Sequence, residues 1–290
     1  MKISAIAHGD MDSATTRIRL YSILAALPPK YTWSLCKKKA VGDILYVQKD
    51  ASERTLSIAE RAKREGVKIV YDLGDPVGRE HRVAMLALAD IVTTDTNERK
   101  RILSAYAKTI SVVPDCIDYE GKYLDFECAP QVQRIVTFGN TESIEGSASY
   151  INGLSFIKVY ITNRESGCFD NAKFVKWKYH SFIKELAKND VCFLAQSNDA
   201  KSNNRLLVCM RLGIPFITND SVSYRTTLTY AGLDFLIAKD AADIGRIIKT
   251  YMSGDNDRRL EIAQAARKYV EKYSSENTAK KLAEVFECIK

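Results

Sequence analysis

The 290-residue sequence contains no apolar run that approaches the roughly 18 residues of a membrane-spanning helix. Its first residues, MKISAIAHGD, have the pattern of a strand that leads into a polar loop, which is not the pattern of a signal peptide. We therefore expect a soluble protein of the cytoplasm.

Histidine is scarce, and cysteine lacks the spacing of a metal or redox motif. The three histidines, His8, His81 and His180, do not show the i, i+4 spacing of a metal-binding helix. The seven cysteines include no Cys-x-x-Cys pair, and several lie in apolar segments as small hydrophobic side chains. A G-x-G-x-x-G motif after the first strand is also missing, which excludes a dinucleotide-dependent oxidoreductase. We expect reduced thiols and no metal site.

The charge is moderately positive and is spread along the chain. The formal net charge is +7 and the pI is near 8.9. Such a balance suits an enzyme that binds anionic nucleotides, and equally a protein that approaches DNA or a membrane surface. With 46% hydrophobic residues, the chain can bury a large core and is long enough for two domains of ordinary size.

Short apolar segments without polar alternation recur along the chain, and helical patterns follow them. This is typical of buried strands in parallel sheets joined by crossover helices. The predicted strands cover residues 2–7, 43–48, 68–72, 91–94, 110–113, 135–138, 156–162, 174–177, 191–195, 214–218 and 235–237. The predicted helices include residues 52–65, 79–89, 97–106, 147–154, 179–188, 203–212, 223–231, 241–252, 257–273 and 275–289. The sequence therefore predicts an α/β protein.

The regular pattern lapses between Asp115 and Val132, where charged and irregular residues gather. A linker between domains has this character. We therefore predict two Rossmann-like domains, one over residues 1–130 and one over residues 131–290, the second including the terminal helices.

The loop after the predicted strand 191–195 is the strongest candidate for a binding site. It lies beyond the carboxyl end of a parallel strand, where open α/β sheets bind ligands. It brings Lys201, Ser202, Asn203 and Arg205 to the start of the following helix. Backbone N–H groups, the helix dipole and two cationic side chains all favour an anion there. We interpret the loop as a phosphate site; the alternative is an asparagine cap beside two solvated basic residues.

Several segments, taken in their order and spacing, resemble the glycosyltransferases of the GT-B fold, closest to the family 4-like branch. They are IVYDLGD (69–75), ADIVTTDTN (89–97), SVVPDCID (111–118), RIVTFGN (134–140), KFVKWKYHSFIKELAKNDVCFL (173–194), KSNNRLLVCMRLGIPFIT (201–218) and ARKYVEKYSSENTAKKLAEVF (266–286). The resemblance covers nearly the whole chain. It implies two Rossmann-like domains facing across a cleft, with a nucleotide sugar held mainly by the second and the acceptor by the first. It also implies that no metal is needed, because basic side chains and helix N-termini take up the charge of the departing diphosphate. No cofactor is implied either, since the nucleoside diphosphate sugar is a substrate.

The resemblance implies roles for the candidates of the second domain. Lys201 and Arg205 would stabilise the negative charge that builds on the leaving diphosphate. Further neutral donors would come from Ser202, Asn203, Gly139 and Asn140. A glycine after a strand lets backbone approach a ligand, although an ordinary turn glycine fits the same pattern.

One departure from the family pattern concerns two glutamates, the second of which contacts the nucleotide ribose in many family 4 enzymes. Counted back from Gly213, their places are occupied here by Ala200 and Val208. A retaining family 4 mechanism is therefore not carried across. The KSNNR segment as a substitute, an unusual donor and a lost activity are the alternatives.

Polar residues that follow two predicted strands of the first domain are candidates for activating the acceptor. An inverting sugar transfer needs a base that takes the proton from the attacking hydroxyl. His8 and Asp10 follow the first strand, and Asp72 and Asp75 lie at the end of another. The plain alternatives are a structural histidine and a helix cap.

Arg17 and Arg19 lie at the start of the helix that follows the first strand. Residues two positions apart do not share a helix face. We therefore expect one of the two side chains to reach the cleft and the other to be solvated.

The function that the sequence favours is a hexosyltransferase-type glycosyltransferase, which moves a sugar from a nucleotide sugar to an acceptor hydroxyl. One alternative is a phage-type glycosyltransferase that acts on modified bases of DNA, since the chain is basic. Another is a non-catalytic nucleotide-binding module, for which the missing glutamates are the main argument.

Overall fold

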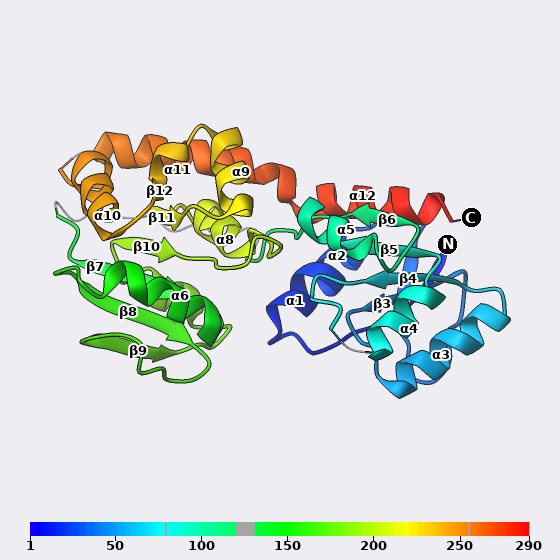
Figure 1. Ribbon diagram of the computed structural model, residues 1–290. Coiled ribbons are helices and arrows are strands. Elements are labelled where there is room, and N and C mark those ends of the chain that lie inside the picture. Colours follow the sequence, from blue (N-terminus) through cyan, green and yellow to red (C-terminus); the bar gives the residue numbers. More distant parts are fainter. Residues whose placement is uncertain (79, 120–130, 255, 290) are drawn as a thin grey trace. The chain divides into compact units, whose positions relative to one another are not determined.

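The structure, a computed structural model, describes residues 1–78, 80–119, 131–254 and 256–289. These residues form two compact units (Figure 1). The first contains Met1–Asp118, Ala200–Ser202 and the residues from Lys272 onward, and the second contains the described residues between Tyr119 and Asp199 together with Asn203–Glu271. Most of the linker predicted at residues 115–132 lies outside the described residues.

The first unit is built on six parallel strands in the order β2-β1-β3-β4-β5-β6. These are β1 (Lys2–Ile6), β2 (Thr32–Leu35), β3 (Ile44–Gln48), β4 (Lys68–Asp72), β5 (Ile91–Thr94) and β6 (Ile110–Val112). The segments between them carry α1 (Ala14–Thr16), η1 (Arg17–Tyr21), α2 (Ser22–Ala25), α3 (Glu53–Arg64), α4 (Glu80–Leu88) and α5 (Asn97–Leu103). The sequence does not predict β2, because this edge strand is mostly exposed and so lacks an apolar run.

Apolar residues cover both faces of this sheet, which explains why its strands lack polar alternation. All five residues of β3 are buried. Ile44 and Tyr46 belong to one core cluster, together with residues of η1 and α2. Leu45 and Val47 belong to a second cluster, together with residues of α3 and α4. Successive residues of the strand therefore enter two different cores.

The second unit repeats this architecture with six parallel strands in the order β12-β11-β10-β7-β8-β9. These are β7 (Arg134–Phe138), β8 (Ile157–Thr162), β9 (Ala172–Lys176), β10 (Val191–Leu194), β11 (Phe216–Asn219) and β12 (Ile237–Ala238). Its helices are α6 (Thr141–Ile151), α7 (Phe182–Leu186), α8 (Asn204–Leu212), α9 (Val222–Ala231), η2 (Asp234–Leu236), α10 (Ala241–Ile247), η3 (Ile248–Met252) and α11 (Asn256–Val270). The short helix η4 (Glu271–Tyr273) follows. The prediction of an α/β fold with parallel sheets is thus confirmed.

Two helix ends show how local sequence fixes these boundaries. α8 ends at Gly213, whose φ of 76° lies in the left-handed region that glycine adopts readily. α6 begins at Thr141, six residues before the predicted start, because Asn140 caps it. The Oδ1 atom of Asn140 accepts a hydrogen bond from the backbone N of Ser143 at 3.0 Å.

The last helix, α12 (Ser275–Glu287), packs on the first unit, where Figure 1 shows it in red near β6. Its Phe286 is fully buried. The centroid of the Phe286 ring lies 5.9 Å from that of Tyr31 and 6.2 Å from that of Tyr46. The hydroxyl of Tyr31 donates to Glu287 Oε1 at 2.6 Å. The sequence-based division assigned this helix to the second domain, so the two divisions differ here. Within the described ranges, no helix is both long and apolar enough to cross a membrane.

Candidate functional site

The candidates of the second unit follow two neighbouring strands. β7 pairs with β10, and both run in the same direction, so their carboxyl ends meet at one edge of the sheet. The loop of Gly139 and Asn140 leaves β7 there, and the loop that ends at Asn203 leaves β10. This is the edge at which open parallel sheets bind ligands.

Arg205 joins the ends of these two strands. Its Nη1 donates to the carbonyl oxygen of Phe138 at 3.0 Å, and its Nη2 donates to that of Ala195 at 2.5 Å. The side chain is half-buried and is therefore not the solvated basic residue of the alternative interpretation. These contacts use two of the five N–H bonds of a guanidinium, so donors remain for a ligand.

Gly139 makes room for this arginine. Its φ is +143°, and a Cβ atom built there would lie 3.2 Å from the Cδ and 3.3 Å from the Nη1 of Arg205. The close approach that requires a glycine is thus that of a neighbouring side chain. The sequence suggested either a bound ligand or an ordinary turn, and it could not reveal this third reason.

Asn140 and Asn203 precede helices but make different contacts. Asn140 caps α6 with its side chain, whereas Asn203 gives α8 no side-chain cap. Instead, the Nδ2 of Asn203 donates to Thr227 Oγ1 on α9 at 2.7 Å. The asparagine-cap alternative is therefore wrong for Asn203. The first turn of α8 keeps backbone N–H groups and a positive dipole end directed at the strand ends, which suits an anion.

Lys201 and Ser202 belong to the first unit, unlike Asn203 and Arg205. The Ser202 hydroxyl donates to Asp115 Oδ2 at 2.5 Å. The carbonyl oxygen of the preceding Ala200 accepts from Thr96 Oγ1 at 3.3 Å and from Arg99 Nη2 at 3.4 Å. Lys201, half-buried, lies between these two anchored residues.

Both arginines of the first unit are buried, so the expectation that one would be solvated is wrong. Arg17 pairs with Asp118, with 2.6 Å between Nη2 and Oδ2. Arg19 pairs with Asp72 and with Asp115. Each side chain instead reaches a carboxylate supplied by a distant segment of the chain.

Asp72 is held in a buried network. Its Oδ2 accepts from Arg19 Nε at 2.8 Å, and its Oδ1 accepts from Arg19 Nη2 at 2.5 Å and from Thr93 Oγ1 at 2.7 Å. The residue is 1% exposed. Burial opposes the charge of Arg19, but Asp72 and Asp115 raise the pKa of this arginine well above its usual value. Asp72 therefore serves as an anchor for a permanent cation, and the geometry does not fit the predicted role of a base.

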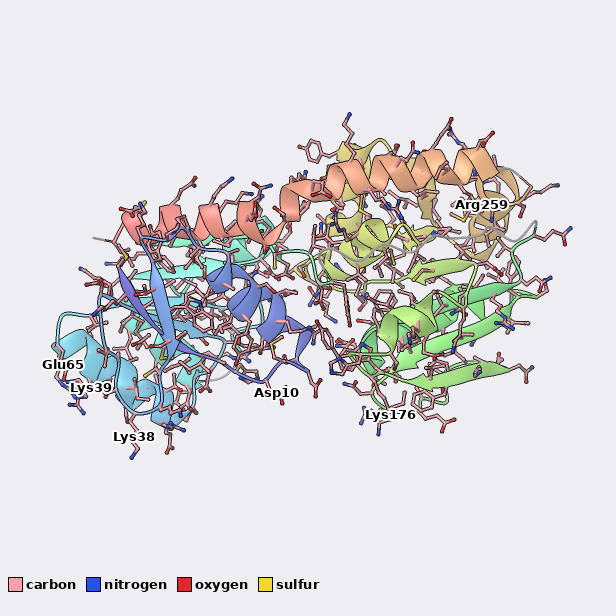
Figure 2. All side chains as sticks on the ribbon, turned by 180° about the vertical axis from the view of Figure 1, so that it is seen from behind. Asp10, Lys38, Lys39, Glu65, Lys176 and Arg259 are labelled. Atoms are coloured by element: carbon pink, nitrogen blue, oxygen red, sulfur yellow. The ribbon has the colours of Figure 1, made fainter. Side chains whose placement is uncertain are left out.

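The other predicted bases make local contacts. His8 is exposed, and its backbone N donates to Gln48 Oε1 at 3.0 Å. Asp10 lies at the surface on the loop after β1 (Figure 2), where its Oδ1 accepts from the backbone N of Asp12 at 3.0 Å. Asp75 is half-buried and forms ion pairs with Lys49 at 2.8 Å and Arg82 at 3.3 Å. These contacts do not bring the three residues together.

Asp95 is a candidate that sequence reasoning missed. It directly follows β5, and its Oδ1 lies 3.2 Å from Thr94 Oγ1, whose hydroxyl donates to the carbonyl oxygen of Leu73 at 2.8 Å. Burial, and then the charge of Asp115, raise the pKa of Asp95 to about 7, while Arg19 and Arg99 oppose the shift. The signal was present, because a carboxylate after a buried strand is the same pattern that singled out Asp72.

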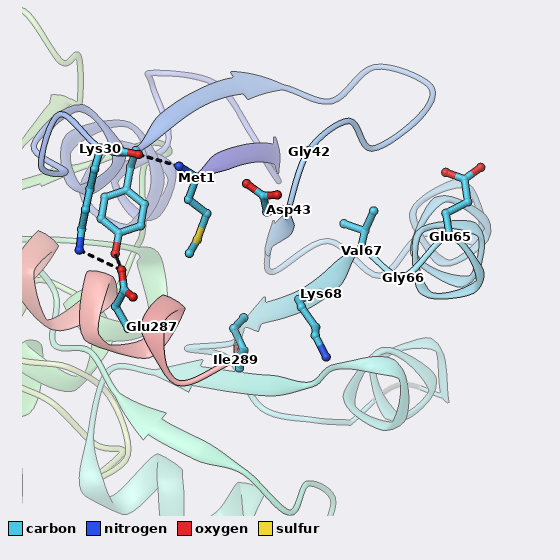
Figure 3. Close-up of a pocket in the computed structure, with 11 residues that line it drawn as sticks. Met1, Lys30, Gly42, Asp43, Glu65, Gly66, Val67, Lys68, Glu287 and Ile289 are labelled. Atoms are coloured by element: carbon cyan, nitrogen blue, oxygen red, sulfur yellow. Dashed lines mark hydrogen bonds and ion pairs between the residues drawn. The ribbon is translucent and has the colours of Figure 1, made fainter.

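A hollow of about 630 Å³ opens at the other edge of the first sheet (Figure 3). Its lining includes Asp43 and Lys68, which lie at the beginnings of β3 and β4, and Glu287 of α12. Lys30 and Glu287, which also line it, form an ion pair at 3.0 Å. Since ligands of parallel sheets bind at the carboxyl ends of strands, this hollow does not belong to the candidate site. In the described part of the chain, no cluster of three His, Cys, Asp or Glu side chains is arranged to hold a metal ion.

No protein-family model matches the chain. No curated protein matches it either. Solved structures do match. Anabaena HepE in complex with UDP has a TM-score of 0.71 and 11% identity, with 99% of this chain and 100% of that chain covered.

Two further structures show the same likeness. A glycosyltransferase from Rickettsia africae has a TM-score of 0.65 and 14% identity, with 85% of this chain and 76% of that chain covered. The lipopolysaccharide outer core galactosyltransferase WaaB has a TM-score of 0.59 and 12% identity, with 99% of each chain covered. The fold of this chain is therefore that of the GT-B glycosyltransferases, whereas its place near family 4 remains a prediction.

Proposed function

We propose that the chain is a glycosyltransferase that moves a sugar from a nucleoside diphosphate sugar to an acceptor hydroxyl. The observation that carries the proposal is the first turn of α8, which has no side-chain cap and has Arg205 beside it at the ends of β7 and β10. The fold likeness supports it, since HepE has been solved with UDP and with UDP-glucose.

The chemistry follows from where charge develops. When the bond between the sugar and the diphosphate breaks, negative charge builds on the departing phosphate oxygens. Backbone N–H groups of a helix N-terminus and fixed cations stabilise that charge best when they are oriented beforehand. Arg205 is oriented in this way by two carbonyl groups. In the proposal it acts with Lys201, and Ser202, Asn203 and Asn140 supply neutral donors, so no metal ion is required.

The absence of the two family glutamates affects how the ribose of the donor is held. Val208 is 6% exposed within α8, and Ala200 is 6% exposed. Neither side chain can hydrogen-bond a ribose hydroxyl, so other groups must hold the ribose. We therefore propose UDP, which binds the structural neighbour HepE, as the first nucleotide to examine, with GDP as the comparison.

The donor site is tested by calorimetric titration of UDP and UDP-glucose. Lys201→Ala and Arg205→Ala are each expected to weaken donor binding or turnover by roughly ten- to a thousandfold, as for the loss of one charge-stabilising contact. Lys176→Ala is the matched control, since Lys176 is an exposed lysine on β9 (Figure 2). Because Arg205 also joins two strand ends, the melting temperature of its variant is measured in parallel. Unchanged binding and turnover in both variants would refute the site.

Turnover and acceptor class are tested separately. Release of free UDP from UDP-glucose distinguishes an enzyme from a non-catalytic module, which would bind tightly without release. Binding to duplex DNA that weakens steeply with salt would support a DNA acceptor, because phosphate contacts release counterions. Indifference to DNA would remove that alternative.

A further inference from the structure

The loop between β2 and β3 presents three consecutive lysines on the surface of the first unit. Lys37, Lys38 and Lys39 are all exposed, and Lys38 and Lys39 can be followed in Figure 2. Lys39 forms an ion pair with Glu65 at 3.0 Å. Among the described residues, no carboxylate pairs with the ammonium group of Lys37 or Lys38. Two of the three positive charges are therefore uncompensated within the unit.

Contacts with β1 and α3 hold this loop in one shape. Arg54, on α3, donates through its Nη2 to the carbonyl oxygen of Lys37. The buried hydroxyl of Ser4, on β1, donates to the carbonyl oxygen of Val41 at 2.9 Å and accepts from the backbone N of Val41 at 2.8 Å. Between these points, Ala40 is 4% exposed. Since the backbone is already fixed, little conformational entropy is lost when the lysines meet a partner.

The neighbouring helix does not neutralise the loop. Arg54 is exposed and forms no ion pair within the described ranges, so it adds a cation beside Lys37. Glu65 is the carboxylate that pairs with the loop, and its Oε1 is shared between Lys39 and Arg61, each at 3.0 Å. One carboxylate thus serves two cations, and the loop keeps a positive charge.

Two exposed aliphatic side chains bracket the lysines in the sequence. Leu35, the last residue of β2, is 46% exposed, and Val41 is 67% exposed. Val41 keeps this exposure although its own backbone is tied to a buried hydroxyl, so its side chain takes no part in the core. Lysines beside outward apolar side chains suit the surface of a lipid bilayer, which offers both anionic headgroups and an apolar layer. A nucleic acid backbone offers its phosphates alone.

We propose that this loop, residues 35–42, binds the surface of a bilayer that contains anionic phospholipids. The lysines contact the phosphates and carboxylates of the headgroups, and Val41 enters the layer beneath them. Near an anionic leaflet each lysine strengthens binding by about fivefold. Three lysines and one valine give an attachment that is weak and reversible, unlike that of a membrane-spanning helix. The proposal concerns the first unit alone and is independent of sugar transfer.

The test measures how much of the full-length protein sediments with lipid vesicles. The vesicles contain phosphatidylcholine alone, or phosphatidylcholine and phosphatidylserine in equal parts. The wild type should bind only the second kind. Salt at about 1 M should abolish this binding, because the Debye length then falls to about 3 Å. The triple variant Lys37→Ala, Lys38→Ala, Lys39→Ala should bind the anionic vesicles about 30- to 100-fold more weakly.

A matched control removes the same charge from another surface. It is the triple variant of three exposed lysines on β9 and directly after it, and it should lose less than about threefold of the binding, since distant charges are screened. The three changes are Lys173→Ala, Lys176→Ala and Lys178→Ala. Melting temperatures of both triple variants are measured in parallel, to show that each is folded.

A second variant keeps every charge and removes the apolar tip of the loop. Val41→Ser should weaken binding to the anionic vesicles about three- to tenfold, because a small apolar side chain no longer enters the bilayer. Val83→Ser is its control, since Val83 is 42% exposed on α4, and it should bind as the wild type does.

Three results would overturn the proposal. The first is a wild type that does not bind anionic vesicles, or that binds phosphatidylcholine alone equally well. The second is an equal loss in the two triple variants, which would show that the overall charge of the protein attracts the vesicles. The third is binding of duplex DNA that depends on Lys37, Lys38 and Lys39 while Val41→Ser binds vesicles normally, which would assign the loop to nucleic acid.

Discussion

The guanidinium of Arg19 and the carboxylate of Asp72 form a two-point ion pair, with 2.8 Å between Nε and Oδ2 and 2.5 Å between Nη2 and Oδ1. Arg19 is 1% exposed and Asp72 is 1% exposed. Burying two charges away from water is unfavourable unless they are paired and hydrogen-bonded. Here each charge pairs with the other, Arg19 also donates to Asp115, and Thr93 donates to Asp72. The pair is therefore a structural unit of the first sheet.

Removal of Arg19 should destabilise the first unit strongly. Arg19→Met leaves Asp72 and Asp115 buried without their cation, and the free energy of unfolding should fall by about 3–5 kcal/mol. The protein has two tryptophans, Trp33 in the first unit and Trp177 in the second. Urea unfolding followed by the fluorescence of Trp33, in a Trp177→Phe background, therefore reports the first unit.

The control for that experiment is Arg61→Met, which removes an exposed i, i+4 pair with Glu65. It should leave the free energy of unfolding almost unchanged, because water and salt screen an exposed pair. An Arg19 variant no less stable than this control would show that the buried network is dispensable.

Gly139 should not tolerate a side chain. Gly139→Ala combines a φ of +143° with a Cβ atom 3.2 Å from Arg205 Cδ and 3.3 Å from Ser143 Cβ. The expected loss is about 1–3 kcal/mol of stability, because a strained backbone and a displaced arginine add together. Thermal unfolding of the second unit, followed by Trp177, measures it. Gly153→Ala is the matched control, since a methyl group added there would meet no atom of the described residues within 4 Å; a similar loss in both would refute the packing argument.

Asp95 should make the free energy of unfolding decrease as the pH rises. Its pKa is about 7 in the folded protein and about 3.9 in an unfolded chain, so the folded state holds the proton more tightly. Stability therefore decreases as pH rises from about 4 to about 7. Asp95→Asn removes this penalty and should be more stable than the wild type at pH 8, by about 1–3 kcal/mol, but not at pH 4.

Thermal unfolding at these two pH values, followed by Trp33, checks the prediction. A variant that is less stable than the wild type at pH 8 would contradict the raised pKa.

Phe286 should be critical for the first unit, although it lies near the other end of the chain. Phe286→Ala removes a fully buried ring between Tyr31 and Tyr46, and the expected loss is about 3–5 kcal/mol. The decrease should appear in the unfolding of the unit that contains Trp33 and spare the one that contains Trp177. Tyr230→Ala, at a position 75% exposed on α9, should leave both transitions unchanged. An equal loss in the two units would contradict the assignment of α12.

Much of the fold follows from local sequence. β3 and β4 are predictable because each contains a short apolar run, over residues 44–47 and 69–71, of the kind that a sheet covered on both faces buries. β2 is not predictable in this way, because an edge strand with exposed residues has no such signal. The amphipathic pattern of α12 indicates that one face is buried, but it does not say against which sheet.

The site was harder to predict, because its contacts join distant positions. Arg19 and Asp72 are 53 positions apart, and Arg19 and Asp115 are 96 apart. Strand-end patterns place such residues at one edge of a sheet, but they do not reveal which carboxylate meets a cation. For this reason Asp72 was predicted to be a base, whereas it pairs with Arg19, and Asp95 was overlooked.

The placement of α12 also has a consequence for synthesis. Strands β1 to β6 leave the ribosome early, but on one face of their sheet, which η1 and α2 cover only in part, the core cluster stays incomplete until residues 275–287 have been translated. All the helices and strands of the second unit are made before that moment. The first unit is therefore completed after the second, which reverses the usual order in which the N-terminal domain folds first. Until then the nascent chain exposes an apolar surface that a chaperone can bind.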